Sequence, residues 1–151
     1  MSIFRNVATG AVGGLAGGLA MLMVRTIGIE ADLIQETLPD KYERGMERLL
    51  GFAESTDAEE EKQLAVAEHL ALSAGLGAGY GAVRGLSQSD SLPVGIAFAA
   101  AVYFLMVGVA GPLLGVTRPP WSKPASGVIG EVLNHVLFGS VTAIVSRRLH
   151  K

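Results

Sequence analysis

Long stretches with almost no charge constrain this chain more than any other feature of its sequence. Residues 6–24 form a run of nineteen uncharged residues, and residues 91–117 form a run of twenty-seven. Two further stretches, residues 63–83 and 124–146, are each interrupted only by one Glu and one His. A helix needs about 20 mostly apolar residues to cross the hydrocarbon core of a bilayer. The sequence therefore predicts an all-α polytopic membrane protein, a four-helix bundle. Its transmembrane helices are expected at about 6–24, 63–83, 92–116 and 124–146. Residues 1–151 would form a single membrane domain.

The composition excludes several classes of protein. Half of the residues are hydrophobic, 17% are charged and the mean hydropathy is +0.42, which disfavours a water-soluble domain of this size. The chain has no cysteine, so disulfides, thiolate metal centres and cysteine nucleophiles are excluded. The formal charge is −2, and no nucleic-acid partner is expected from that balance.

The segment between the first two spans is an acidic loop. Residues 25–62 carry eleven acids against five bases. After Pro39, apolar residues recur at helical spacing, which predicts an amphipathic helix in this first extramembrane loop. The apolar positions of that helix are Leu38, Tyr42, Met46, Leu49 and Leu50.

The distribution of basic residues predicts the orientation in the membrane. Four spans put both termini on one side, and the short segments on that side carry five bases, namely Arg5, Arg84, Arg147, Arg148 and Lys151. Because short cytoplasmic segments are enriched in Lys and Arg, both termini are expected to be cytoplasmic. The predicted location is the cytoplasmic (inner) membrane of a cell, with the lipid bilayer as partner. Trp121 is then expected to anchor the opposite interface.

Glycine rows predict how the helices pack. Gly10, Gly14 and Gly18 recur at every fourth position of the first span. The second span carries two such rows, Gly75/Gly79 and Gly77/Gly81/Gly85. Small residues at this spacing let helix backbones approach closely in lipid. The first two spans are therefore expected to form the tightest pair, although such a glycine zipper is equally typical of a contact between copies in a homo-oligomer.

Polar residues inside the second and fourth spans are the candidate site. They are Glu68, His69, Glu131, Asn134 and His135. Ionisable groups within a membrane are costly and usually face the interior of a helix bundle. Three interpretations stay open: a network that only braces the helices, a proton- or ion-linked site, and a metal or haem site with His69, His135, Glu68 and Glu131 as ligands.

The second half of the chain resembles a known family. The motifs are His69-Leu-Ala-Leu-Ser73 with Gly79-Tyr80, the stretch Gly-Pro-Leu-Leu-Gly-Val-Thr-Arg-Pro-Pro-Trp over residues 111–121, Glu131-x-x-x-His135, and Arg147-Arg148-Leu149. Over residues 68–149 the chain looks like the YagU-like family of small bacterial inner-membrane proteins. The resemblance implies a multi-span membrane protein linked to acid tolerance, and it implies no substrate and no catalytic residue.

These observations favour a membrane protein that is not an enzyme. The sequence contains no phosphate-binding loop, nucleophile elbow or His-Glu-x-x-His motif. The predicted role is ion or proton handling, or tolerance of acid stress, without a cofactor. The alternatives are a structural or assembly subunit of a larger membrane complex, and a membrane protein that binds a divalent metal or haem at the Glu/His cluster.

Overall fold

The computed structural model describes residues 3–30, 58–87, 91–115 and 117–150, and these residues are almost entirely helical. The long helices are α1 (Ile3–Glu30), α3 (Ala58–Ser87), α4 (Leu92–Tyr103) and α6 (Ala125–His150). A π-helical segment, η1 (Phe104–Ala110), and the short α5 (Gly111–Leu113) continue α4, and the single turn η2 (Pro120–Ser122) precedes α6. The chain is therefore all-α throughout its described part. The amphipathic helix predicted around residues 38–50 and most of the predicted acidic loop lie outside the described residues.

The end of the α4 run follows from one proline. Pro112 has no N–H to give the helix, and its ring crowds the preceding turn. The backbone adapts by widening into η1, where the N–H of Gly111 donates to the carbonyl of Met106 five residues earlier. The helical run stops at Leu113, and Gly115 then turns the chain with a φ of 69°. Gly111-Pro112 thus marks the end of this helical run.

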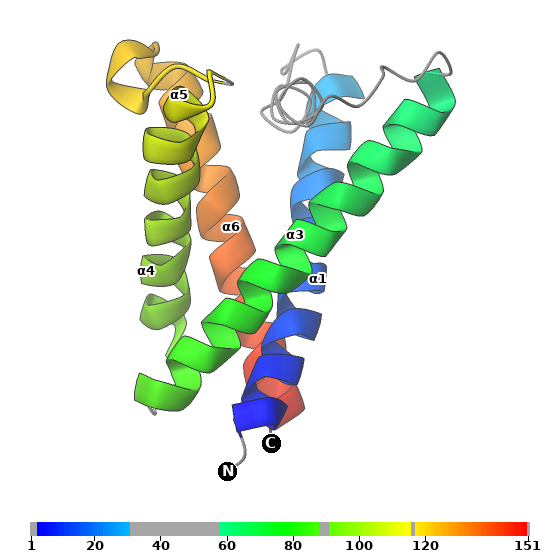
Figure 1. Ribbon diagram of the computed structural model, residues 1–151, viewed down its shortest axis with the longest axis vertical. Helices are drawn as coiled ribbons and strands as arrows, with labels where there is room; N and C mark the ends of the chain where they lie inside the picture. Colours follow the sequence, from blue (N-terminus) through cyan, green and yellow to red (C-terminus); the bar gives the residue numbers. More distant parts are fainter. Residues whose placement is uncertain (1–2, 31–57, 88–90, 116, 151) are drawn as a thin grey trace.

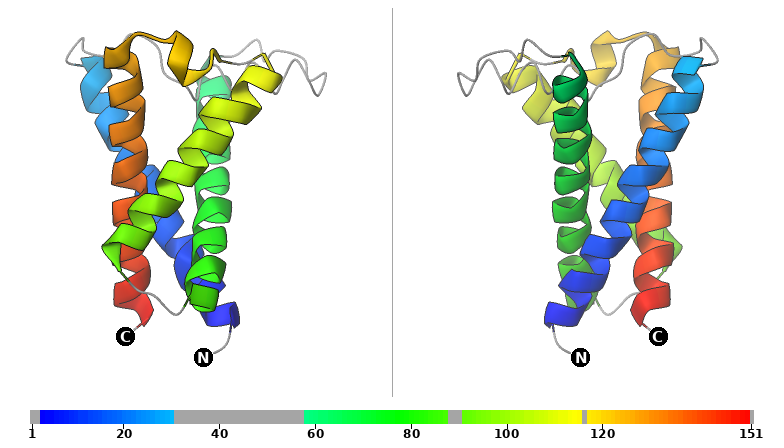
Figure 2. Two further views of the ribbon diagram at one scale, coloured as in Figure 1. Left: turned by 90° about the vertical axis from the view of Figure 1, so that its left-hand side faces the viewer. Right: turned by 90° about the vertical axis from the view of Figure 1, so that its right-hand side faces the viewer.

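Helices α1 and α6 are central in the packing of the four long helices. Helix α1 packs against α3 on one side and α6 on the other, and α4 packs mainly on α6. Both termini, the end of α3 and the start of α4 lie at one end of the molecule, which we call the termini end (Figure 1). The other end, the loop end, carries α5, η2 and the start of α6 (Figures 1 and 2). Helix α1 thus separates α3 from α6 over most of their length, and the two helices meet at the termini end.

Glycines set the close approach of α1 to its neighbours. A Cβ at Gly14 would come within 2.7 Å of the Cα of Gly77, and a Cβ at Gly10 within 2.8 Å of the Cα of Gly81. On another face of α1, a Cβ at Gly17 would come within 2.7 Å of the Thr142 hydroxyl of α6. The backbones of α1 and α3 therefore touch directly, so that only glycine fits at these crossing points.

Only one of the two glycine rows on α3 takes part in this contact. Gly77 and Gly81 face α1, whereas a Cβ at Gly75 would meet nothing within 4 Å and one at Gly79 only the ring of Phe98 at 3.9 Å. Positions two residues apart lie about 200° apart around a helix, so the two rows cannot face the same neighbour. The packing role predicted for Gly75 and Gly79 is therefore corrected: the α1 contact uses the other row.

Three helical runs are long and apolar enough to cross a membrane: Ile3–Gly28, Leu92–Leu113 and Ala125–His150. In each of them fewer than a third of the residues in the most apolar window are buried inside the molecule, so most of their apolar side chains face outward. This is the pattern of a small integral membrane protein, in which those side chains face lipid. Helix α3 is less apolar, because Glu68 and His69 interrupt it and glycines replace larger aliphatic residues.

Candidate functional site

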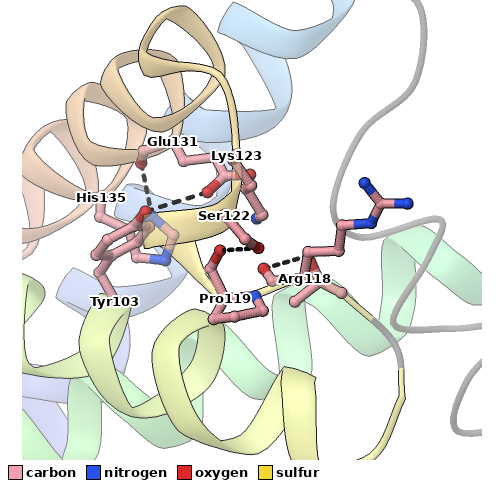
Figure 3. Close-up of polar contacts among 8 residues, drawn as sticks. Tyr103, Arg118, Pro119, Ser122, Lys123, Glu131 and His135 are labelled. Carbon is pink, nitrogen blue, oxygen red and sulfur yellow. Dashed lines mark hydrogen bonds and ion pairs between the residues drawn. The ribbon is translucent and has the colours of Figure 1, made fainter.

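A polar group at the loop end is built around Glu131. Its Oε1 atom accepts a hydrogen bond from Lys123 Nζ at 2.7 Å, and its Oε2 atom accepts one from the Tyr103 hydroxyl at 3.1 Å. Glu131 comes from α6, Tyr103 from the last turn of α4 and Lys123 from the segment after η2, so three parts of the chain meet here (Figure 3). The side chains of Lys123 and Glu131 are only 12% and 17% exposed. Glu131 is therefore a largely buried carboxylate with both oxygens occupied.

His135 lies one turn further along α6, next to this group. Its Nδ1 atom is 2.8 Å from the carbonyl oxygen of Glu131, and its ring meets that of Tyr103 edge to face with centroids 5.1 Å apart (Figure 3). A carbonyl oxygen only accepts hydrogen bonds, so Nδ1 must carry the hydrogen. In the neutral ring the other nitrogen, Nε2, is then the atom that can take up a proton.

His69 shows the same arrangement with the two nitrogens exchanged. Its Nε2 atom is 3.2 Å from the carbonyl oxygen of Gly18 on α1, so Nε2 carries the hydrogen and Nδ1 can take up a proton. His69 and His135 lie close enough for a charge on one imidazole to act on the other, and Arg25 acts on His69 in the same way. The structure therefore brings His69, His135 and Glu131 into one region of the bundle.

Glu68 and Asn134 do not join that group by any described hydrogen bond. Glu68 is exposed on α3, about 100° around the helix from His69. Asn134 is half-buried, and its Oδ1 atom has no hydrogen-bond partner among the described residues. Within those same residues no three His, Asp or Glu side chains are grouped as metal ligands. Among the described residues His69, His135, Glu68 and Glu131 are thus not grouped as one ligand set, and Glu68 is exposed.

The sequence analysis missed Tyr103 and Lys123. Tyr103 is a hydroxyl-bearing residue in an otherwise apolar run, and Lys123 precedes Glu131 by eight residues, just before the helix that carries the carboxylate. Each was a visible polar residue near a predicted span, but neither position indicates by spacing alone that it contacts Glu131.

A second polar group, at the termini end, was also missed. Arg84 of α3 is only 3% exposed, and its Nη2 atom donates to Asn6 Oδ1 at 3.1 Å, to Thr9 Oγ1 at 3.4 Å and to His150 Nδ1 at 2.9 Å. Ser146, which is fully buried, donates to the carbonyl of Thr9 at 3.1 Å. The group ties α3 to both α1 and α6. Its only sequence signal was an arginine at the end of a glycine-rich helix, which was interpreted as a topology signal alone.

Comparison with known proteins identifies no relative. No protein-family model, curated protein or solved structure matches this chain. The resemblance to the YagU-like family accordingly stays a prediction based on the quoted motifs, and the functional argument depends on the geometry described above.

Proposed function

We propose that this chain is a small inner-membrane protein with four transmembrane helices that takes up and passes on protons through His69, His135 and Glu131. The observation that carries the proposal is the hydrogen bonding of the two histidines. Each histidine donates a hydrogen bond from one ring nitrogen to a backbone carbonyl, and its other ring nitrogen can accept a proton. Imidazole is the side chain whose charge changes most readily near neutral pH.

Protonation of either histidine leaves these hydrogen bonds intact. The nitrogen that faces the carbonyl is already the donor, so adding a proton to the other nitrogen breaks no contact described here. Glu131 lies one turn from His135 towards the loop end, where a carboxylate held by Lys123 and Tyr103 offers a neighbouring site for a proton or counter-charge.

A four-span arrangement is supported by the course of α3. This helix runs from the loop end to the termini end beside α1, over the same height as the other helices (Figures 1 and 2). The sides of α3 that carry His69 and Gly77 pack on α1, which would shield the imidazole from lipid. The even number of crossings agrees with two termini at one end, which we propose to be the cytoplasmic end.

Proton movement in reconstituted vesicles tests this function. Purified protein is placed in liposomes that enclose a pH-sensitive dye, and the internal pH is followed after an external acid jump. We expect wild type to speed equilibration, and the double variant His69→Phe, His135→Phe to fall to the rate of empty liposomes. Glu68→Gln is the matched control, because Glu68 is exposed beside His69 and should leave the rate unchanged.

Two results would contradict the proposal. One is a wild-type rate equal to that of empty liposomes, and the other is a double variant that is folded and as fast as wild type. Glu131→Gln adds a further comparison, since it keeps the shape of the side chain and removes its charge. We expect this variant to slow proton movement without abolishing insertion into the membrane.

A role as an assembly subunit is the second candidate, and one observation favours it. Gly75 on α3 is exposed and would leave room for a partner helix, since nothing lies within 4 Å of its Cβ position. Native mass spectrometry of wild type and Gly75→Leu in the same detergent tests this candidate. A complex lost only in Gly75→Leu would support it, and a monomer in both would contradict it.

A further inference from the structure

The third histidine, His150, makes the opposite kind of hydrogen bond from His69 and His135. Its Nδ1 atom is 2.9 Å from Arg84 Nη2. A guanidinium has only donors and stays charged at any pH that a protein experiences. His150 Nδ1 must therefore be the acceptor, so this hydrogen bond requires an unprotonated Nδ1 atom.

His150 also joins the ends of three helices. It is the last residue of α6, its ring accepts from Arg84 on α3, and its carbonyl oxygen accepts from Arg5 Nη2 on α1 at 3.1 Å. Arg84 in turn donates to Asn6 and Thr9 of α1. These contacts form one group at the termini end, which we call the Arg84–His150 latch.

Basic side chains from three helices lie at or next to His150. Arg84 faces it from α3 and Arg5 from α1, and Arg147 and Arg148 precede it in the last turn of α6. Helix α4, which packs on α6, has no titratable side chain in its first turns. A proton on Nδ1 would thus remove an acceptor from Arg84 and place a second cation beside it.

We infer that His150 is a proton-binding site at the termini end, and that its protonation opens the Arg84–His150 latch and lets α3 move away from α6 there. The buried guanidinium then loses one of its acceptors and is repelled by the imidazolium, whereas the glycine contacts between α1 and α3 remain. This site is separate from the proton-handling histidines near the loop end. It makes the contact between the helix ends dependent on the pH of the compartment that holds the termini.

Distance measurement between two spin labels tests the latch. The chain has no cysteine, so Leu86→Cys on α3 and Leu149→Cys on α6 give one labelled pair. Leu86 is 78% exposed and Leu149 is 48% exposed, so labels fit at both positions. We expect the separation to lengthen and its distribution to broaden between about pH 8 and pH 5, the range that brackets imidazole titration.

Two variants separate the latch from a general effect of acid. In His150→Asn the amide oxygen takes the place of Nδ1 as an acceptor that does not titrate, so the separation should stay short at both pH values. In His150→Lys the charge is permanent, and the separation should be long at both. The double variant His69→Phe, His135→Phe should still respond to pH as wild type does, which keeps this test independent of proton movement in vesicles.

The inference is overturned by a wild-type separation that is the same at both pH values. It is also overturned if His150→Asn responds to pH as wild type does, since the response would then come from other groups. Because this variant keeps a neutral acceptor for Arg84, its folding is tested directly by the short separation at pH 8.

Discussion

At the scale of the residue, the three histidines differ in whether their described hydrogen bonds require a donor or an acceptor nitrogen. His69 and His135 face carbonyl oxygens and act as donors, whereas His150 faces a guanidinium and acts as an acceptor. The sequence places His69 and His135 inside predicted spans and His150 beyond the last one, but it does not show the partner of any of them. Their roles follow from what lies opposite each ring, because an imidazole can donate or accept through either nitrogen.

The hydroxyl of Tyr103 gives a prediction at this scale. Tyr103→Phe keeps the ring that packs against His135 and removes only the donor to Glu131. Loss of a hydrogen bond to a charged group costs about 1.5–3 kcal/mol, and partial exposure places this one at the lower end. The free energy of unfolding, measured in detergent with a denaturant, should fall by about 1.5 kcal/mol. An unchanged value would show that the hydroxyl does not stabilise the carboxylate.

At the scale of the element, α1 acts as the central contact surface because it presents glycines on two faces. Gly10 and Gly14 meet α3, and Gly13 and Gly17 meet α6. Lipid offers no hydrophobic drive between helices, so their association depends on close packing and interhelical hydrogen bonds. The carbonyl of Gly18 adds such a bond by accepting from His69.

A pair of matched glycine substitutions tests this surface. Gly14→Ala places a methyl group against the backbone of Ser73 and Gly77, neither of which can yield locally, and should destabilise the protein by about 1–3 kcal/mol. Gly75→Ala places the same group in open space and should stabilise the helix by up to about 1 kcal/mol. Thermal unfolding in one detergent compares the two variants. Equal effects would mean that α1 and α3 do not touch at Gly14.

At the scale of the whole molecule, polar groups gather near the two ends of the bundle and the outer surface is apolar. Glu131 with Tyr103 and Lys123 lies at the loop end, and the Arg84–His150 latch lies at the termini end. Large hydrophobic residues such as Phe4, Met23 and Leu113 are exposed on the outside. An apolar outer surface of this kind is typical of helices that face lipid.

Labelling of single cysteines tests how the whole molecule crosses the membrane. Gln63→Cys near the start of α3 should react with a membrane-impermeant thiol reagent from the same side as Ser122→Cys. Leu86→Cys near the end of α3 should react from the opposite side, together with Ser2→Cys. Intact cells and inverted vesicles give the two sides. Reaction of Gln63→Cys and Leu86→Cys from one side only would contradict a fourth crossing.

Much of the element structure could be predicted from the sequence, because it depends on local properties. The apolar runs predicted helices that the structure has at residues 3–30, 92–113 and 125–150, with ends that differ by a few residues. A proline has no N–H and ends a helix, and a run of aliphatic side chains favours a membrane-spanning helix. Both effects are local, so they do not depend on the rest of the fold. The pairing of the first two spans through the glycines of α1 was likewise predictable.

The candidate site was only partly predictable for the same reason. Spacing placed Glu131 one turn from His135, but it could not show that α1 lies between α3 and α6 over most of their length. That one feature of the tertiary structure leaves Glu68 exposed and turns Gly77 and Gly81 towards α1 in place of Gly75 and Gly79.

The sequence by itself thus determined which segments are helices and which residues are costly to bury. The tertiary structure alone decided the partners of those residues, as for Arg84, which meets Asn6 and His150 from more than sixty positions away along the chain. The physical reason is that helix periodicity fixes the direction of a side chain around its own axis, whereas its partner depends on which neighbouring helix lies in that direction.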